Sequence, residues 1–318
     1  MPVIQVKSFI THKRGETDTD VQDSIAFDME RGRYALSDGV TNSYLPKIIS
    51  DLLTRTFIEA EEEADFPPAA LPHLFKMERD SYLDNVEEKV LVMLKMVEKT
   101  FHVGAATFAG LTVNGDELKW IILGDSCLFL MPEDGRLRCF SSMPVNVSPE
   151  WLLDVNFDNH PSQIHSDGKV IGEWIKGRRV MSHGWAVLAS DAMSKWIINQ
   201  YNKGRDFISE LWTLDDNEEF EAFVNQEYLA DRLESDDESV ILICIGNNEN
   251  SEINAISEKS EEDEISESST KDENAEDNEN PDLSEISEQS KSEELSQLSD
   301  DLEEHNYYDD FDYSDYAQ

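Results

Sequence analysis

Basic residues are scarce in this chain. Its 318 residues include 26 lysines and arginines against 69 aspartates and glutamates, which gives a formal net charge of −43. A protein that binds the nucleic-acid backbone needs a basic face to neutralise the phosphates. Beyond Lys13 and Arg14, the largest basic cluster is the short stretch 176–179, Lys-Gly-Arg-Arg. The composition therefore argues against nucleic acid as a partner.

Cysteines and long apolar runs are also few. Cys127, Cys139 and Cys244 lie in or beside apolar runs without the spacing of a metal site, so we expect buried free thiols in a reducing compartment. No apolar run is long enough to span a bilayer, and the N-terminal residues lack the pattern of a signal peptide. We therefore expect a soluble, cytoplasmic monomer with no membrane partner.

The composition changes abruptly near Gly246. The residues after it include 26 acidic residues against three lysines, and serine and asparagine supply much of the rest. Such a segment buries too little apolar surface to offset the conformational entropy lost on ordering. We therefore predict one folded domain over residues 1–245 and a disordered acidic tail over residues 246–318.

The apolar pattern of residues 1–245 alternates between strand-like and helical periods. Strands are predicted at 24–28 and 33–37, and the tight turn between them should place Asp23 and Asp38 at neighbouring strand ends. Helical spacing follows over 43–64 and 80–101, then a meander of short strands over 104–141, with 143–166 irregular. Later strands are predicted at 184–190 and 239–245, with helices between them. This order favours an α+β fold with mostly antiparallel sheets.

Aspartates recur where the predicted strands begin or end. Asp38 is followed by Gly39, and Asp125, Asp191 and Asp236 stand at corresponding places in three later segments. An isolated Asp-Gly pair is usually an ordinary turn. Four such aspartates can converge at one sheet edge, where cations must neutralise them. Oxygen ligands without histidine or cysteine favour Mg²⁺ or Mn²⁺ over zinc or copper.

Six short motifs, in order, resemble those of the metal-dependent PP2C-type (PPM) serine/threonine protein phosphatases, and the resemblance spans nearly all of residues 1–245. Each motif alone is weakly specific, whereas six in the right order are specific. They are Gln22-Asp23-Ser24, Ser37-Asp38-Gly39, Gly104-Ala105-Ala106-Thr107, Leu123-Gly124-Asp125-Ser126, Ala189-Ser190-Asp191-Ala192 and Asp236-Asp237-Glu238-Ser239.

The resemblance implies an α-β-β-α sandwich of two antiparallel sheets flanked by helices, with two Mn²⁺ or Mg²⁺ ions at one end. Asp38 would bridge both ions and Gly39 would offer its carbonyl oxygen, while Asp191 and Asp236 would complete one ion's shell. Asp23 would act on the attacking water, and Asp125 with Asp191 would hold a third, looser ion. Two such ions lower the pKa of a water that then attacks phosphorus directly.

The chain departs from the family pattern near the phosphate. Asp18 stands where the family usually has a phosphate-binding arginine, so Arg14 and Lys13 become the candidates for that role. Val40-Thr41-Asn42 replaces the histidine that often follows the Asp-Gly pair, so no leaving-group acid is identified. Ala192 and Asp237 replace a glycine and an asparagine, and neither position need supply a ligand.

Two functions remain open at this point. The first is metal-dependent hydrolysis of phosphoserine or phosphothreonine in a phosphoprotein substrate. The second is a catalytically silent phosphatase-like module that binds and regulates a phosphoprotein or a Ser/Thr kinase. The complete set of ligand aspartates favours the enzyme.

Overall fold

Two five-stranded antiparallel sheets form the centre of the protein. The computed structural model describes residues 3–61, 66–157 and 161–246. The predicted acidic tail lies outside these residues, apart from Gly246, which ends the last strand. The first sheet has the strand order β1 (Val3–Thr11), β15 (Glu238–Gly246), β14 (Gly184–Ala189), β7 (Cys127–Pro132) and β8 (Arg138–Phe140).

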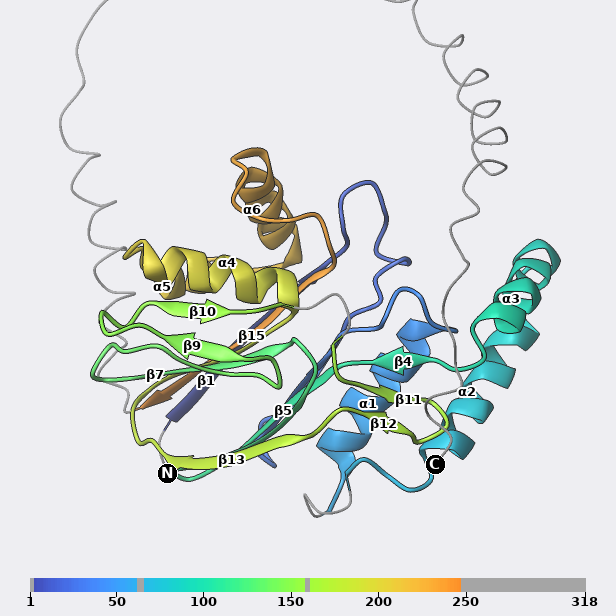
Figure 1. Cartoon of the computed structure of the whole chain (residues 1–318), viewed down its shortest axis with the longest axis horizontal. Helices are drawn as coiled ribbons and strands as arrows, with labels where there is room; N and C mark the ends of the chain where they lie inside the picture. The colour runs from blue at the N-terminus through green and yellow to red at the C-terminus, as the bar shows by residue number, and fades with distance from the viewer. Residues whose placement is uncertain (1–2, 62–65, 158–160, 247–318) are drawn as a thin grey trace, which may run out of the picture. The chain divides into compact units, whose positions relative to one another are not determined.

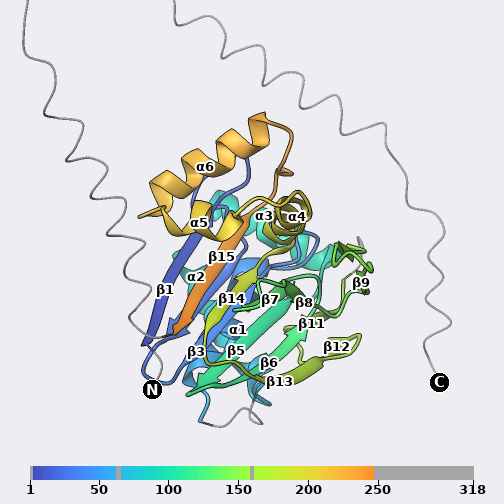
Figure 2. The ribbon, with the colours of Figure 1, turned by 90° about the vertical axis from the view of Figure 1, so that its left-hand side faces the viewer.

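The second sheet lies face to face with the first (Figure 2). The hairpin predicted from the sequence forms one edge of it, with Ser24 paired to Ser37. The order of its strands is β13 (Ile175–Val180), β6 (Glu117–Leu123), β5 (Phe108–Asn114), β3 (Arg33–Ser37) and β2 (Ser24–Asp28).

Helices cover the outer faces of both sheets (Figure 1). Helices α4 (Asp191–Asn202), α5 (Phe207–Trp212) and α6 (Asn217–Leu229) pack on the first sheet. Helices α1 (Pro46–Glu59) and α2 (Leu71–Asn85) bury side chains against the second. None of the helices in the described residues is both long and apolar enough to cross a membrane. The architecture confirms the predicted α-β-β-α sandwich.

The period of two along each strand sorts the side chains into three apolar cores. In β15, Val240 and Leu242 face the helices α4–α6, whereas Ile241 and Ile243 face the space between the sheets. The same alternation in β6 places Ile121 against α1, in the third core. Strands such as β15 are apolar on both faces because helices cover one face and the other sheet covers the other.

Short strands lie in the stretch 143–166, which the sequence indicated as irregular, and one of them pairs with short strands outside it. The strand β4 (Ala105–Ala106) pairs with β11 (Gln163–His165), which pairs with β12 (Val170–Ile171). A separate pair joins β9 (Val145–Val147) and β10 (Leu153–Val155). With two or three residues each, these strands are too short for a hydrophobic period to show in the sequence.

The helix predicted over 80–101 is wrong as a single element. The structure has α2 and α3 (Glu88–Thr100), separated at Val86, whose backbone is extended. Pro72 lies in the first turn of α2 and begins that helix, since proline is tolerated where the N–H would be unpaired. No side chain of α3 is buried, so its apolar period does not face a core.

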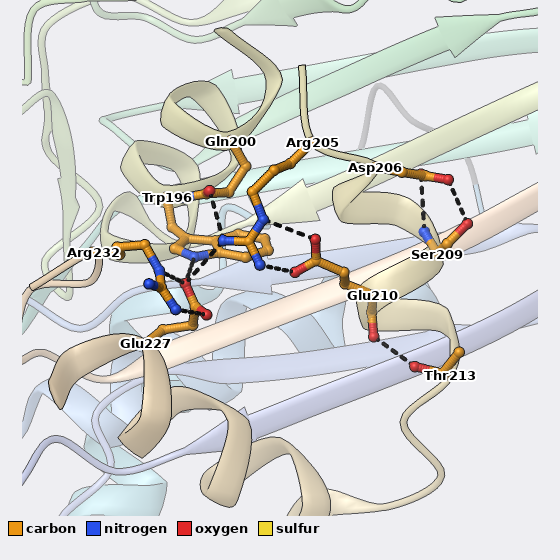
Figure 3. Close-up of polar contacts among 9 residues, drawn as sticks. All are labelled: Trp196, Gln200, Arg205, Asp206, Ser209, Glu210, Thr213, Glu227 and Arg232. Carbon is orange, nitrogen blue, oxygen red and sulfur yellow. Dashed lines mark hydrogen bonds and ion pairs between the residues drawn. The ribbon is translucent and has the colours of Figure 1, made fainter. Parts of the chain in front are cut away.

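A polar network ties helices α4, α5 and α6 together (Figure 3). The side chain of Glu227 is 3% exposed, and Arg232 donates to it through Nη2 and Nε at 2.6 and 2.7 Å. The indole N–H of Trp196 donates to the same carboxylate at 2.8 Å. The hydrogen bonds from Arg232, the largest effect, lower the pKa of Glu227, although burial opposes them. This acid is therefore buried as a fully paired carboxylate.

Candidate metal centre

Asp38 and Gly39 follow strand β3 and continue its pairing onto β4. The N–H of Thr107 donates to the carbonyl of Asp38 at 2.8 Å, and Gly39 forms a bridge with Ala106. A Cβ added at Gly39 would lie 2.8 Å from the carbonyl oxygen of Gln22, so only glycine fits without a shift. This close packing fixes the backbone at the position where the sequence predicts a carbonyl ligand.

Asp23 precedes strand β2 and lies beside Asp38, as the hairpin register requires. The hydroxyl of Ser239 donates to Asp23 Oδ2 at 2.6 Å, whereas Oδ1 finds no donor among the described residues. Asp23 is 1% exposed. Burial raises the pKa of Asp23 well above its ordinary value, even though the Ser239 hydrogen bond lowers it. One oxygen is therefore held in place and the other is available to a ligand.

Asp125 stands at the turn between β6 and β7. Gly124 has a φ of +105°, a left-handed conformation that favours glycine, and a Cβ there would meet Thr107 at 2.5 Å. Asp125 is 6% exposed, and within the described chain its Oδ1 has no hydrogen-bond donor. Burial, followed by the charge of Asp191, raises the pKa of Asp125 to about 7.

Asp191 begins helix α4 directly after strand β14. Its Oδ1 accepts the N–H of Ala192 at 2.6 Å, and its Oδ2 accepts from Lys195 Nζ at 2.9 Å. A carboxylate in the first turn of a helix is favoured there by the helix dipole. The strand-to-helix junction thus presents Asp191 to the same end of the sandwich as Asp38.

The loop before β15 carries Asp236 and is held by its neighbour Asp237. The two oxygens of Asp237 accept the backbone N–H groups of Lys13 and Gln22 at 3.1 and 2.7 Å. Asp236 itself is exposed, and partial loss of hydration followed by the charge of Asp191 raises its pKa. Asp237 therefore ties the loop of Asp236 to the segments that precede β2.

The predicted aspartates form one electrostatic cluster. The charge of Asp191 raises the pKa of Asp23, Asp38, Asp125 and Asp236. For Asp38 the largest cause is burial, followed by the charges of Asp23 and Asp191. Carboxylates lie close together when the charge of one raises the pKa of several others. The structure thus brings together all five aspartates that the sequence singled out.

The atoms that this cluster offers to a metal are all oxygens, which suit a hard divalent cation. Two of these buried oxygens, Asp23 Oδ1 and Asp125 Oδ1, accept no hydrogen bond in the described part of the chain. Among the described residues, no three histidine, cysteine, aspartate or glutamate side chains are grouped closely enough to form a finished cage. Carboxylates repel one another, and Asp191 is turned toward Ala192 and Lys195. Side-chain rotations are therefore needed to complete a coordination shell.

The two basic residues predicted to bind phosphate lie at different places. Burial lowers the pKa of Lys13, but its hydrogen bond with Glu16 and the charges of Asp237 and Asp236 outweigh burial and raise it. Lys13 is therefore close to the carboxylate cluster. The guanidinium of Arg14 instead lies over the ring of Tyr228 in α6, 4.8 Å from its centroid.

Two charged residues of the site were missed by the sequence reasoning. Lys195 contacts Asp191, and its only signal was the spacing of four residues along a helix. Glu238 is 2% exposed, and burial raises its pKa to about 9. Glu238 is the first residue of β15 and follows a run of acids. The sequence therefore gave no sign that its side chain would be buried.

This chain is similar to known proteins in its structure but not detectably in its sequence. No protein family model matches the sequence, and no curated protein does. The catalytic domain of the serine/threonine protein phosphatase PstP, solved with two manganese ions, is 16% identical with a TM-score of 0.45, covering 77% of this chain and 99% of that one. Stp1 of Staphylococcus aureus, a serine/threonine phosphatase, is 14% identical with a TM-score of 0.45, covering 76% and 95%.

PstP/Ppp of Mycobacterium tuberculosis gives a similar result, with 15% identity, a TM-score of 0.45 and coverage of 78% of this chain and 100% of that one. All three are described as serine/threonine phosphatases. At such identities and TM-scores, the function has to be argued from the residues of this chain.

Proposed function

We propose that this protein hydrolyses phosphoserine or phosphothreonine in phosphoproteins, with two Mn²⁺ or Mg²⁺ ions held by the aspartate cluster. The observation that carries the proposal is the set of buried carboxylates that the described basic residues neutralise only in part. Asp23 and Asp125 are nearly inaccessible to solvent, yet each leaves one oxygen without a donor in the described residues. Such an arrangement is costly unless a cation neutralises it.

The proposed ligands follow from where each group lies. Asp38 lies next to Asp23 and within the field of Asp125, Asp191 and Asp236, which supports it as a ligand that both proposed ions would share. The Gly39 carbonyl, Asp191 and Asp236 would complete the shells. Divalent cations bound there would lower the pKa of a water molecule and polarise the phosphoryl oxygens.

Asp23 has a role of its own in this proposal. Its Oδ2 is fixed by Ser239, so its Oδ1 has a defined direction and can accept a hydrogen bond from the attacking water. This hydrogen bond would orient the water toward phosphorus, and Asp23 Oδ1 would accept its proton. Asp23 is therefore a proposed catalytic residue, whereas Ser239 positions it.

Lys13 is the better placed of the two candidates for the phosphate. It is close enough to Asp236 and Asp237 for their charges to raise its pKa, whereas Arg14 lies on Tyr228. A cation is needed here because an acidic surface repels the phosphate group of the substrate. We therefore expect Lys13 to contribute more to substrate binding than Arg14.

The test is hydrolysis of a phosphothreonine peptide with added Mn²⁺. The metal-free control is the same assay on protein treated with EDTA and given no Mn²⁺. The variants are Asp38→Asn and Asp236→Asn, with Asp80→Asn as the matched control, because Asp80 is an acid on α2 paired with Lys76 and Arg79. We expect turnover that depends on Mn²⁺, a loss of about a thousandfold in Asp38→Asn, and a wild-type rate in Asp80→Asn.

Absence of turnover with either metal and any phosphopeptide would contradict the proposal. Binding of the phosphopeptide without hydrolysis would then support the silent phosphatase-like module.

A further inference from the structure

Lys195 places a positive charge inside the aspartate cluster. Its Nζ donates to Asp191 Oδ2 at 2.9 Å and to Glu234 Oε2 at 2.8 Å. It also lies over the ring of Phe157, 5.4 Å from the centroid. Burial alone would lower the pKa of Lys195, but Asp191 and Glu234 raise it well above its ordinary value. The side chain is therefore a charged ammonium, 28% exposed and fixed from three sides.

The charge of this ammonium reaches Asp125 as well. Burial and Asp191 raise the pKa of Asp125, and Lys195 opposes them. Asp125 Oδ1 is buried and has no hydrogen-bond donor within the described ranges, so the ammonium of Lys195 acts on Asp125 through its charge and not through a hydrogen bond. Asp125 and Asp191 are the pair for which the sequence predicted a third, looser ion. For this pair the chain supplies a cation of its own, Lys195.

We propose that Lys195 takes the place of a third divalent cation at Asp125 and Asp191. A divalent ion there would have to share Asp191 Oδ2 with an ammonium that already hydrogen-bonds it, and the two positive charges would repel each other. The same ammonium also ties α4 to Glu234, two residues before Asp236 in the loop that carries this ligand. The metal centre is therefore limited to two ions, and Lys195 positions both Asp191 and the Asp236 loop.

This inference rests on the proposed function in one respect, since it takes the aspartates as cation ligands. It differs in what it predicts, namely the change in the number of ions when Lys195 loses its charge. A readout of bound metal therefore separates the two, because it does not require turnover.

The experiment titrates the metal-free full chain with Mn²⁺ at pH 8 and measures free Mn²⁺ by electron paramagnetic resonance. Lys195→Gln removes the charge, Lys195→Met also removes it while keeping an unbranched chain beside Phe157, and Lys195→Arg keeps it. Lys76→Gln is the matched control, because Lys76 pairs with Asp80 at the same spacing of four residues, away from the cluster. Circular dichroism verifies the fold of each variant.

We expect Lys195→Gln and Lys195→Met to bind one more Mn²⁺ per chain than the wild type. Lys195→Arg and Lys76→Gln should bind the wild-type number. Adding Asp125→Asn to Lys195→Gln should abolish the gain, which would locate the new ion. Three ions in the wild type, or equal numbers in the wild type and the folded Gln or Met variant, would overturn the inference. A wild type that binds no Mn²⁺ would contradict the proposed function, while a gain of one ion in Lys195→Gln would still support the inference.

Discussion

Two groups of buried acids in this protein are treated in opposite ways. Glu227, between α4 and α6, receives hydrogen bonds from Arg232 and Trp196, and its pKa is lowered. Asp23 and Asp38, at the end of the sandwich, have each other and further aspartates as neighbours, and their pKa values are raised. The fold therefore neutralises the buried Glu227 with its own cations, whereas among the described residues most carboxylates of the aspartate cluster have no such partner.

The difference indicates what each group of acids does. A paired carboxylate such as Glu227 stabilises the arrangement of helices and needs nothing from outside. Carboxylates without a countercharge cost stability in the metal-free protein, which is the usual sign of a site shaped for a ligand. Lys195 lies between these extremes, because it neutralises part of the cluster and leaves the rest.

The largest expected change in stability comes from breaking the paired group. Arg232→Met leaves Glu227 buried with the indole of Trp196 and with Arg205, whose Nη1 is 3.6 Å away. We expect the free energy of unfolding in urea to fall by about 2 kcal/mol, since a buried charge loses its main partner. The control is Arg138→Met, because Arg138 pairs with the more exposed Asp134. That variant should lose less than about 1 kcal/mol, and equal losses would show that burial of Glu227 carries no cost.

A smaller effect of opposite sign is expected in the unpaired group. Asp38→Asn removes a charge that its neighbours disfavour, so the metal-free protein at pH 8 should gain about 1 kcal/mol in free energy of unfolding. Glu227→Gln, the matching removal of a charge from the paired group, should lose about 1 kcal/mol. Urea unfolding in EDTA measures both. A loss of stability in both variants would remove the distinction between the two groups.

The last expected effect is the dependence of stability on pH. The pKa values of Asp125 and Glu238 are raised to about 7 and about 9. The stability that these acids contribute is therefore fully present below their ordinary pKa values, and it is lost as the pH rises through the raised pKa values. We expect the free energy of unfolding of the metal-free protein to fall from pH 7 to pH 9.

Asp125→Asn should reduce this slope near pH 7. Asp134→Asn should leave it unchanged, because the hydrogen bond from Arg138 lowers the pKa of Asp134 and keeps its titration far below this range. A flat profile in the wild type would contradict the raised pKa values.

Much of the fold could be predicted where the apolar periodicity continued over many residues and where turn residues such as glycine separated the strands. The strands at 24–28 and 33–37 were predicted with their observed bounds, and the meander predicted over 104–141 contains β5, β6, β7 and β8. The helix over 80–101 was wrong, because apolar spacing alone does not show whether a helix faces a core, and α3 does not. The strand β13 was missed, since its exposed positions at one sheet edge carry charged side chains such as Lys176 and Arg178.

The site was predicted as far as strand ends could be recognised. Asp38, Asp125, Asp191 and Asp236 follow or precede apolar runs, and antiparallel pairing brings such ends together. Lys195 could not be found in this way, because whether a lysine in a helix faces solvent or an acid depends on tertiary packing. The stacking of Arg14 on Tyr228 likewise joins segments far apart in the sequence. The roles of the site residues remain predictions.

The most direct test of the metal centre is calorimetric titration of the metal-free protein with Mn²⁺ at pH 8. The wild type is compared with Asp38→Asn and with Asp80→Asn as the control for loss of an acid elsewhere. We predict two bound ions in the wild type and in Asp80→Asn, and none in Asp38→Asn, because the carboxylate of Asp38 would be a ligand of both proposed ions. Equal binding by the wild type and Asp38→Asn, or no binding by the wild type, would contradict the account.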